Sequence, residues 1–229
     1  MGKKKTSSAL AKRVRILEHK QDADDKTVET KNAYYTAAGL MDDAWSVNFG
    51  MLPRLLQGIE ADGPTNVASN FNAKGRIGNT VNLRQLTANI ICRLPVDTDG
   101  FGLGQTYADC RVIIVDNLTD NTGLTAADVL KDITQSYRSL LTTYKTEIGS
   151  GKRYRVMMDK KFNLNPAHPS HRLSFVMPIS KSGRVVHYGS ALDENPTDLN
   201  LSMIWFADAP VSLTSPKIAY FLKAKYEDA

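Results

Sequence analysis

The sequence lacks the features that mark disulfide-stabilised, membrane-spanning and secreted proteins. Only two cysteines, Cys92 and Cys110, occur among 229 residues. They fall on separate predicted strands, so we expect free thiols in a reducing compartment. No apolar run approaches the roughly 18 residues that a membrane-spanning helix needs. The N-terminus is charged and has no apolar core of a secretory signal. These absences favour a soluble fold with a conventional hydrophobic core.

Motifs of catalysis and metal binding are also missing. The sequence contains no P-loop, dinucleotide-binding fingerprint, nucleophile elbow or Cys-x-x-Cys pair. His168 and His171 are close in sequence, but Pro169 lies between them and no third ligand is near, which favours a loop pair over a metal site. His187 stands alone, without the partner histidine of a cupin-type centre. The glycine-rich segment 100–104 has no following helix and is interpreted as a loop. We therefore expect neither an enzyme nor a cofactor.

Positive charge is concentrated at one end of the chain. Residues 1–20 contain seven basic residues and one acidic residue, a net charge of +6. The remaining residues contain 22 basic and 23 acidic residues, a net charge of −1. A basic segment ahead of a nearly neutral body indicates a polyanionic partner for that segment.

This basic N-terminal arm, residues 1–25, is predicted to be partly helical or disordered. Ser7 or Ser8 can cap a helix that runs to about Lys20 and carries a narrow apolar stripe. A phosphate-binding arm is one interpretation, and a solvated tail or nuclear-localisation signal is the other. The predicted nucleic-acid-binding residues of the arm are Lys3, Lys4, Lys5, Lys12, Arg13, Arg15 and Lys20. The acidic run 22–25 is interpreted as a solvated linker, with a structural Ca²⁺ site between subunits as the alternative.

Residues 26–229 are predicted to form one all-β domain, because no Pro/Gly/Ser-rich linker divides them. Short segments with alternating apolar residues and turn residues between them are typical of two packed antiparallel sheets. Nine candidate strands follow from this pattern, one more than a jelly roll needs. They are residues 27–36, 45–52, 80–94, 110–117, 152–164, 171–180, 184–189, 200–208 and 217–226.

Three of these candidate strands have further features. In 80–94, Leu86 to Leu94 alternate in one phase while Val81 and Leu83 alternate in the other, which predicts a bulge near Gln85 in a long strand at the edge of the sheet. The segment 111–116 is apolar on both faces and predicts a buried central strand. In 152–164, one face is predicted to hold Tyr154, Val156, Met158, Phe162 and Leu164, and the other Arg153, Arg155, Asp159, Lys161 and Asn163.

One helix is expected in a connection between strands. Thr125 can cap a helix over 126–133, and residues 135–145 can continue it or form a second turn. Long loops are predicted at 57–75, 96–108 and 190–199. Trp45 and Trp205 are interpreted as core or interface aromatics.

Four segments, taken in order, resemble coat proteins of small icosahedral viruses. They are residues 76–84 (RIGNTVNLR), 111–117 (RVIIVDN), 155–165 (RVMMDKKFNLN) and 201–208 (LSMIWFAD). The first is similar to the turn that leads into the strand that is usually lettered C in those proteins. The pattern is similar to the single jelly-roll capsid proteins of circular, Rep-encoding single-stranded DNA viruses. It is similar also to the coat protein of satellite tobacco necrosis virus.

This resemblance implies an eight-stranded jelly roll, sixty copies of which would close a T=1 shell around a single-stranded genome. The protein would then be part of the virion, assemble with itself inside the host cell, and use an unidentified host receptor. Sixty arms would supply about 360 positive charges, fewer than the phosphates of a genome that encodes a coat protein and a replicase. Divalent cations, polyamines or body residues should therefore contribute, and the candidate body residues are Arg84, Lys160 and Lys161. The alternative is a non-viral jelly-roll binding module, a lectin-like or cytokine-like oligomer with a basic tail.

Overall fold

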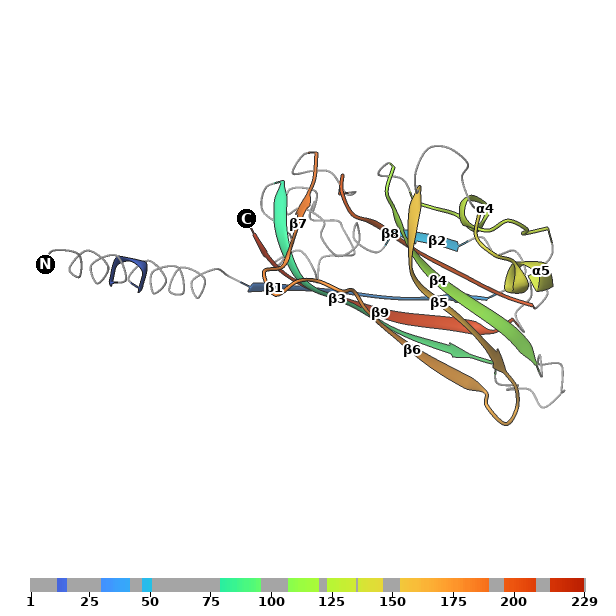
Figure 1. Ribbon diagram of the computed structural model, residues 1–229. Coiled ribbons are helices and arrows are strands. Elements are labelled where there is room, and N and C mark those ends of the chain that lie inside the picture. The colour runs from blue at the N-terminus through green and yellow to red at the C-terminus, as the bar shows by residue number, and fades with distance from the viewer. Residues whose placement is uncertain are drawn as a thin grey trace, which may run out of the picture.

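The computed structural model describes residues 12–15, 30–41, 47–50, 79–95, 107–119, 123–134, 136–145, 153–189, 196–208 and 215–228. It contains two antiparallel sheets packed face to face (Figure 1). The first sheet has the strand order β1-β9-β3-β6, with β7 also paired to β3, and the second has the order β2-β8-β4-β5. The strands are β1 (Thr30–Leu40), β2 (Val47–Gly50), β3 (Thr80–Arg93), β4 (Ala108–Asn117), β5 (Tyr154–Leu164), β6 (Ser170–Val176), β7 (Arg184–His187), β8 (Asn200–Ala207) and β9 (Lys217–Asp228).

These pairings are those of a jelly roll, so the predicted all-β fold is confirmed. β6 pairs with residues 87–93 of β3, and β7 pairs with residues 80–83 of the same strand. β6 and β7 therefore occupy one strand position, interrupted by a turn. This explains why the sequence shows nine candidate strands where a jelly roll has eight.

The long strand β3 lies inside its sheet, and the prediction of an edge strand was wrong. It pairs with β9 on one side and with β6 and β7 on the other. Central and edge strands of an antiparallel sheet both bury one face, so alternation alone does not distinguish them. Jelly-roll strands are lettered in chain order starting from B, so this third strand corresponds to D, and the correspondence to C was wrong. The predicted bulge is confirmed, because the register with β9 shifts between Leu83 and Gln85.

Strand β5 carries a second bulge that the sequence pattern did not predict. Ile114 pairs with Met158, but the next residue, Val115, pairs with Val156. The side chains before Met157 therefore change face relative to those after it. Met158 and Phe162 belong to the core between the sheets, whereas Val156 packs against the outside of the second sheet. The prediction that these residues share one face was wrong for this reason.

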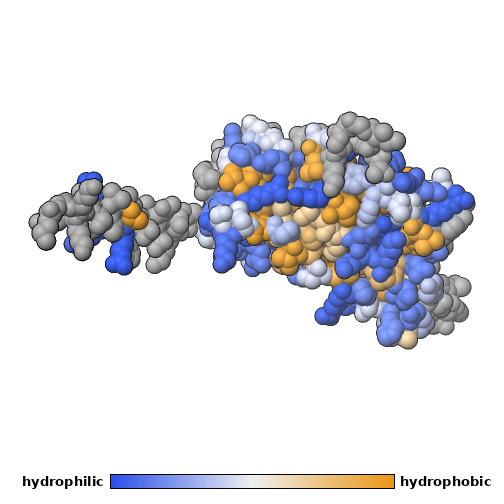
Figure 2. All heavy atoms as spheres, in the orientation of Figure 1, coloured by the Kyte–Doolittle hydropathy of each residue, from blue (hydrophilic) through white to orange (hydrophobic). Residues whose placement is uncertain are grey.

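The main core lies between the two sheets and contains both cysteines. Trp205 of β8 is buried there, and its indole Nε1 donates to the Leu40 carbonyl of β1 at 3.0 Å, so this predicted core aromatic is confirmed. Cys92 and Cys110 are buried and unpaired, as predicted. Burial raises the pKa of Cys92 to about 12, so this thiol stays protonated and unreactive at neutral pH. On the side of the body seen in Figure 2, apolar residues gather near the middle, among hydrophilic ones.

The connection between β4 and β5 covers the outside of the second sheet. It contains α4 (Ala126–Val129) and α5 (Ser136–Leu141), which lie on the side of β4 and β8 away from the first sheet (Figure 1). Leu124, Val129 and Leu140 pack there on Ile113 and Phe206 in a second apolar cluster. The predicted helix over 126–133 is shorter, because Leu130 is extended and forms a β-bridge with Tyr144. At its start, the Asp128 carboxylate accepts hydrogen bonds from the N–H and hydroxyl of Thr125.

The turn between β6 and β7 depends on Gly183. Its φ of +87° is in the region that favours glycine, and a Cβ there would lie 2.0 Å from Asn82 Oδ1. We predict that Gly183→Ala lowers the free energy of unfolding by about 1–3 kcal/mol, measured by urea denaturation. Ser182→Ala, one residue earlier, is the control and should change stability by less. Equal midpoints for Gly183→Ala and the wild type would contradict this prediction.

Candidate nucleic-acid interface

The predicted arm residues are described only in part. Lys12, Arg13 and Arg15 lie in a helical turn over residues 12–15, and all three side chains are exposed. Lys3, Lys4, Lys5 and Lys20 lie outside the described residues, as do the acidic run 22–25, Trp45 and the loop 57–75. The three cations of this turn are open to solvent, so a phosphate can reach them.

Arg84, the first predicted body cation, lies at the bulge of β3 and is already paired. Its Nε and Nη2 contact Glu227 Oε2 at 2.8 and 2.6 Å, and its Nη1 donates to the Lys181 carbonyl at 3.3 Å. Glu227 lies near the end of β9, beside the bulge. Arg84 therefore adds little net charge to its surroundings.

Lys160 and Lys161 lie on β5, in the other sheet. Lys161 is opposite Arg111 of β4. Partial burial and the positive charge of Arg111 lower the pKa of Lys161. The structure therefore does not bring the three predicted body cations together: Arg84 is on the first sheet, and the two lysines are on the second.

Among the described residues, five cations lie on the outer face of the first sheet, and sequence reasoning missed this group. Alternate residues of β9 point away from the core, and Ile218, Tyr220, Leu222, Ala224 and Tyr226 point into it. The cations on this outer face are Lys217, Lys223 and Lys225 of β9, Arg93 of β3 and Arg172 of β6. None of the five forms an ion pair with another residue in the described part of the chain.

Acidic residues are almost absent from the same sheet. β1, β3 and β6 contain no Asp or Glu, and β9 contains none before Glu227. An open hollow of about 860 Å³ lies on this outer face and is lined by Thr36, Asn89, Ile91, Arg172 and Phe221, among others. A concave surface that carries positive charges attracts anions and suits a phosphate backbone. The signal in the sequence was the phase of the lysines in β9, opposite to its buried residues.

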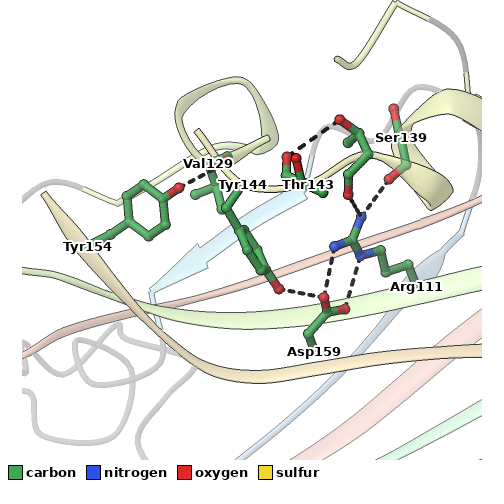
Figure 3. Close-up of polar contacts among 8 residues, drawn as sticks. Arg111, Val129, Ser139, Thr143, Tyr144, Tyr154 and Asp159 are labelled. Atoms are coloured by element: carbon green, nitrogen blue, oxygen red, sulfur yellow. Dashed lines mark hydrogen bonds and ion pairs between the residues drawn. The ribbon is translucent and has the colours of Figure 1, made fainter. Parts of the chain in front are cut away.

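The outer face of the second sheet is closed by a buried arginine (Figure 3). Arg111 is 1% exposed, and its Nε and Nη2 donate to the two oxygens of Asp159 at 3.0 and 2.8 Å. Its Nη1 donates to the carbonyls of Ser139 and Thr142 at 2.7 and 3.1 Å, at the end of α5. Tyr144 donates its hydroxyl proton to Asp159 as well. The guanidinium thus joins β4, β5 and the covering segment 124–145.

A second ion pair crosses the same two strands. Arg155 Nη2 of β5 lies 2.9 Å from Asp116 Oδ2 of β4, and Asp116 also accepts from the Asn200 N–H of β8 at 3.2 Å. Asp116 is buried and Arg155 is exposed. Arg111 and Asp116 belong to one of the four sequence segments, and Arg155 and Asp159 belong to the next. The two segments therefore pair with each other, arginine to aspartate in both directions.

Two of the four histidines, His171 and His187, have structural contacts. The His171 ring stacks on Phe162 at 4.3 Å between centroids, and His187 Nδ1 lies 2.7 Å from Asp198 Oδ2. Among the described residues, no group of three His, Cys, Asp or Glu side chains could hold a metal ion. None of the helices in that same part of the chain is long and apolar enough to cross a membrane.

No protein-family model matches the chain, and no curated protein matches it either. Among solved structures it is similar to Desmodium yellow mottle tymovirus (9% identity, TM-score 0.42, covering 88% of each chain). It is similar also to turnip yellow mosaic virus (10% identity, TM-score 0.42, 89% of this chain and 95% of that chain). A third is mud crab tombus-like virus (11% identity, TM-score 0.37, 89% of this chain and 92% of that chain).

We predict that Arg111→Ala lowers the free energy of unfolding by about 3–5 kcal/mol, because Asp159 and the carbonyls of Ser139 and Thr142 lose their donor. Arg138→Ala is the matched control. Its guanidinium is exposed and lies 3.4 Å from Asp132, a surface pair whose loss should cost about 1 kcal/mol or less. Urea denaturation of the two variants measures the difference. Similar losses for both would show that the Arg111 contacts do not hold the covering segment.

The same ion pair predicts a dependence on pH. Burial alone would raise the pKa of Asp159, but hydrogen bonds from Arg111 and Tyr144 lower it below its ordinary value. A carboxylate with a lowered folded-state pKa stabilises the fold above its unfolded value of about 3.9 and loses that contribution as the pH falls through the folded value. The stability difference between wild type and Asp159→Asn should therefore be constant near neutral pH and shrink below about pH 4. Urea denaturation across this range measures it, and a pH-independent difference would contradict the assignment.

Proposed function

We propose that this chain is the coat protein of a small icosahedral virus, which assembles with itself into a closed shell around a single-stranded genome. One observation carries the proposal. Three of the four segments that resemble coat proteins become the neighbouring strands β8, β4 and β5 of one sheet. Two ion pairs, Arg111–Asp159 and Arg155–Asp116, join the β4 and β5 segments, and the remaining segment leads into β3 of the facing sheet. The jelly-roll order and the motif residues thus support the same family of proteins.

Exposed apolar residues outside the core suit a subunit of a closed shell. Closed point-group symmetry requires several distinct contacts per subunit. Leu141 at the end of α5 is 77% exposed, and the neighbouring hollow of about 370 Å³ is lined by Leu140, Phe162 and Asp208, among others. Tyr107, just before β4, is also exposed. In this proposal such residues become buried between subunits, in a T=1 shell of sixty copies.

The basic arm supplies the contact with the genome. Its net charge of +6 over residues 1–20 stands against a body of −1, so the arm neutralises phosphates without reading bases. The cations of the first sheet's outer face add to the arm where the arm charges do not suffice. In this proposal the protein resides in the virion and is assembled inside the host cell.

The test compares the full chain with a variant in which all seven basic residues of the arm are glutamine. Size-exclusion chromatography with light scattering gives the mass, and the 260/280 nm absorbance ratio gives the nucleic-acid content. We predict uniform particles with a high ratio for the wild type. The variant should show a lower ratio or smaller particles. With fewer cations it neutralises fewer phosphates, so fewer counterions are released on binding.

A clean monomer, trimer or pentamer without nucleic acid at every salt concentration would overturn the proposal. The chain would then be a jelly-roll binding module whose basic tail has another partner. A lysine-to-glutamine change at Lys131, on the covering segment outside the arm, is the control for a general effect of charge. It should leave both the particle mass and the absorbance ratio unchanged.

A further inference from the structure

We infer that the outer face of the first sheet binds unpaired bases of a single strand by stacking them on Phe221. This inference rests on the proposed function and names a second, arm-independent contact with the genome. It starts from a row of residues across four strands: Thr36 of β1, Phe221 of β9, Asn89 of β3 and Ser174 of β6. Phe221 is 37% exposed at the middle of this face and offers an aromatic ring to the surface.

Phe221 forms an aromatic pair with Tyr34, and a lysine lies beside that pair. The rings of Phe221 and Tyr34 have centroids 5.8 Å apart at an interplanar angle of 30°. Lys223 Nζ lies 5.7 Å from the centroid of Tyr34. Aromatic rings that stack successive bases, with cations beside them for the phosphates, are how sequence-tolerant proteins bind single strands.

The charge around the ring selects an anion. Arg172 lines the hollow, and Lys217, Lys223, Lys225 and Arg93 lie on the same face of the sheet. The four strands carry no carboxylate before Glu227. Asn89 lies beside Phe221 and provides an amide for a base edge, with Ser174 Oγ at 3.4 Å from its Oδ1. A purely apolar partner would leave the cations unpaired, whereas a nucleic acid satisfies the cations and the ring together.

The geometry favours single strands over duplexes. The hollow, about 860 Å³, is of the size that takes a few planar groups. In a duplex the base faces are stacked on one another and cannot reach a side chain on a sheet. Unpaired bases can leave the strand and stack on Phe221 while the backbone follows the lysines of β9.

The test uses the full chain with the seven arm residues changed to glutamine, so that binding by the arm is removed. The probes are a labelled 20-nucleotide oligothymidylate, a duplex of equal length, heparin as a polyanion without bases, and polyglutamate as an acidic peptide. Fluorescence anisotropy and competition give the affinities at several salt concentrations. The variants are Phe221→Leu, which keeps the site apolar, and Lys223→Gln/Lys225→Gln. Val185→Ala is the control, since Val185 is an exposed apolar residue of β7 in the same sheet.

We expect Phe221→Leu to weaken oligothymidylate binding about tenfold and to leave heparin binding unchanged, in line with the contribution of one stacked base. The double lysine variant should weaken the binding of both probes and reduce the salt slope for oligothymidylate by about 1.4. The duplex should bind less tightly than the single strand, and Val185→Ala should change nothing.

Three results would overturn the inference: no effect of Phe221→Leu, an equal effect on heparin, or tighter binding of polyglutamate than of oligothymidylate. The outcome is separate from that of the proposed function. Particles with nucleic acid and an inert Phe221 would leave the coat-protein proposal standing without this second contact. Binding that depends on Phe221 in a chain that forms no particles would support the Phe221 contact and overturn the coat-protein proposal.

Discussion

The bulge at Met157 in β5 decides which of the two faces of the second sheet each charged residue of that strand reaches. Without it, Arg155 and Asp159, four residues apart in one strand, would point to the same side. With it, Arg155 reaches Asp116 and Asp159 reaches Arg111 on the other side of the sheet. Arg111 is nearly fully buried, so its charge requires the bidentate carboxylate and the two carbonyls that it finds. Those carbonyls belong to the segment that ends α5, and the buried charge therefore fixes that segment over the second sheet.

The two sheets differ in how much of their outer faces is covered. The second sheet buries both faces of β4 and β8, one against the first sheet and one against the segment that contains α4 and α5. In the part of the chain that the structure describes, the first sheet buries its inner face, and its outer face carries five cations, Tyr34 and Phe221. A partner with negative charge therefore meets an open surface on one side of the body and a covered surface on the other. This asymmetry, together with the basic arm, underlies the proposed contact with a genome.

Much of the fold could be predicted from the sequence, because alternation, turn residues and a phase change near Gln85 are local signals. The bulge in β5 could not, since apolar residues continue at every second position through Met158 and hide the change of face. Nor could the neutralisation of Arg84, whose partner Glu227 is 143 residues away and is placed by the pairing of β3 with β9. The cations of the sheet face were missed for a related reason. They come from three strands, and only the sheet order places Arg93, Arg172 and Lys223 on one surface.

The most direct test of whether the open, cationic face meets the genome is ultraviolet cross-linking of particles that contain nucleic acid. Mass spectrometry then identifies the cross-linked peptides. The account predicts cross-links in the arm and in peptides that contain Phe221 and Tyr34 on the open sheet. Peptides from the covering segment 124–145 should carry few. Cross-links concentrated in that segment, with none in β9 or β1, would contradict the claim that the open, cationic face of the sandwich is the one that meets the genome.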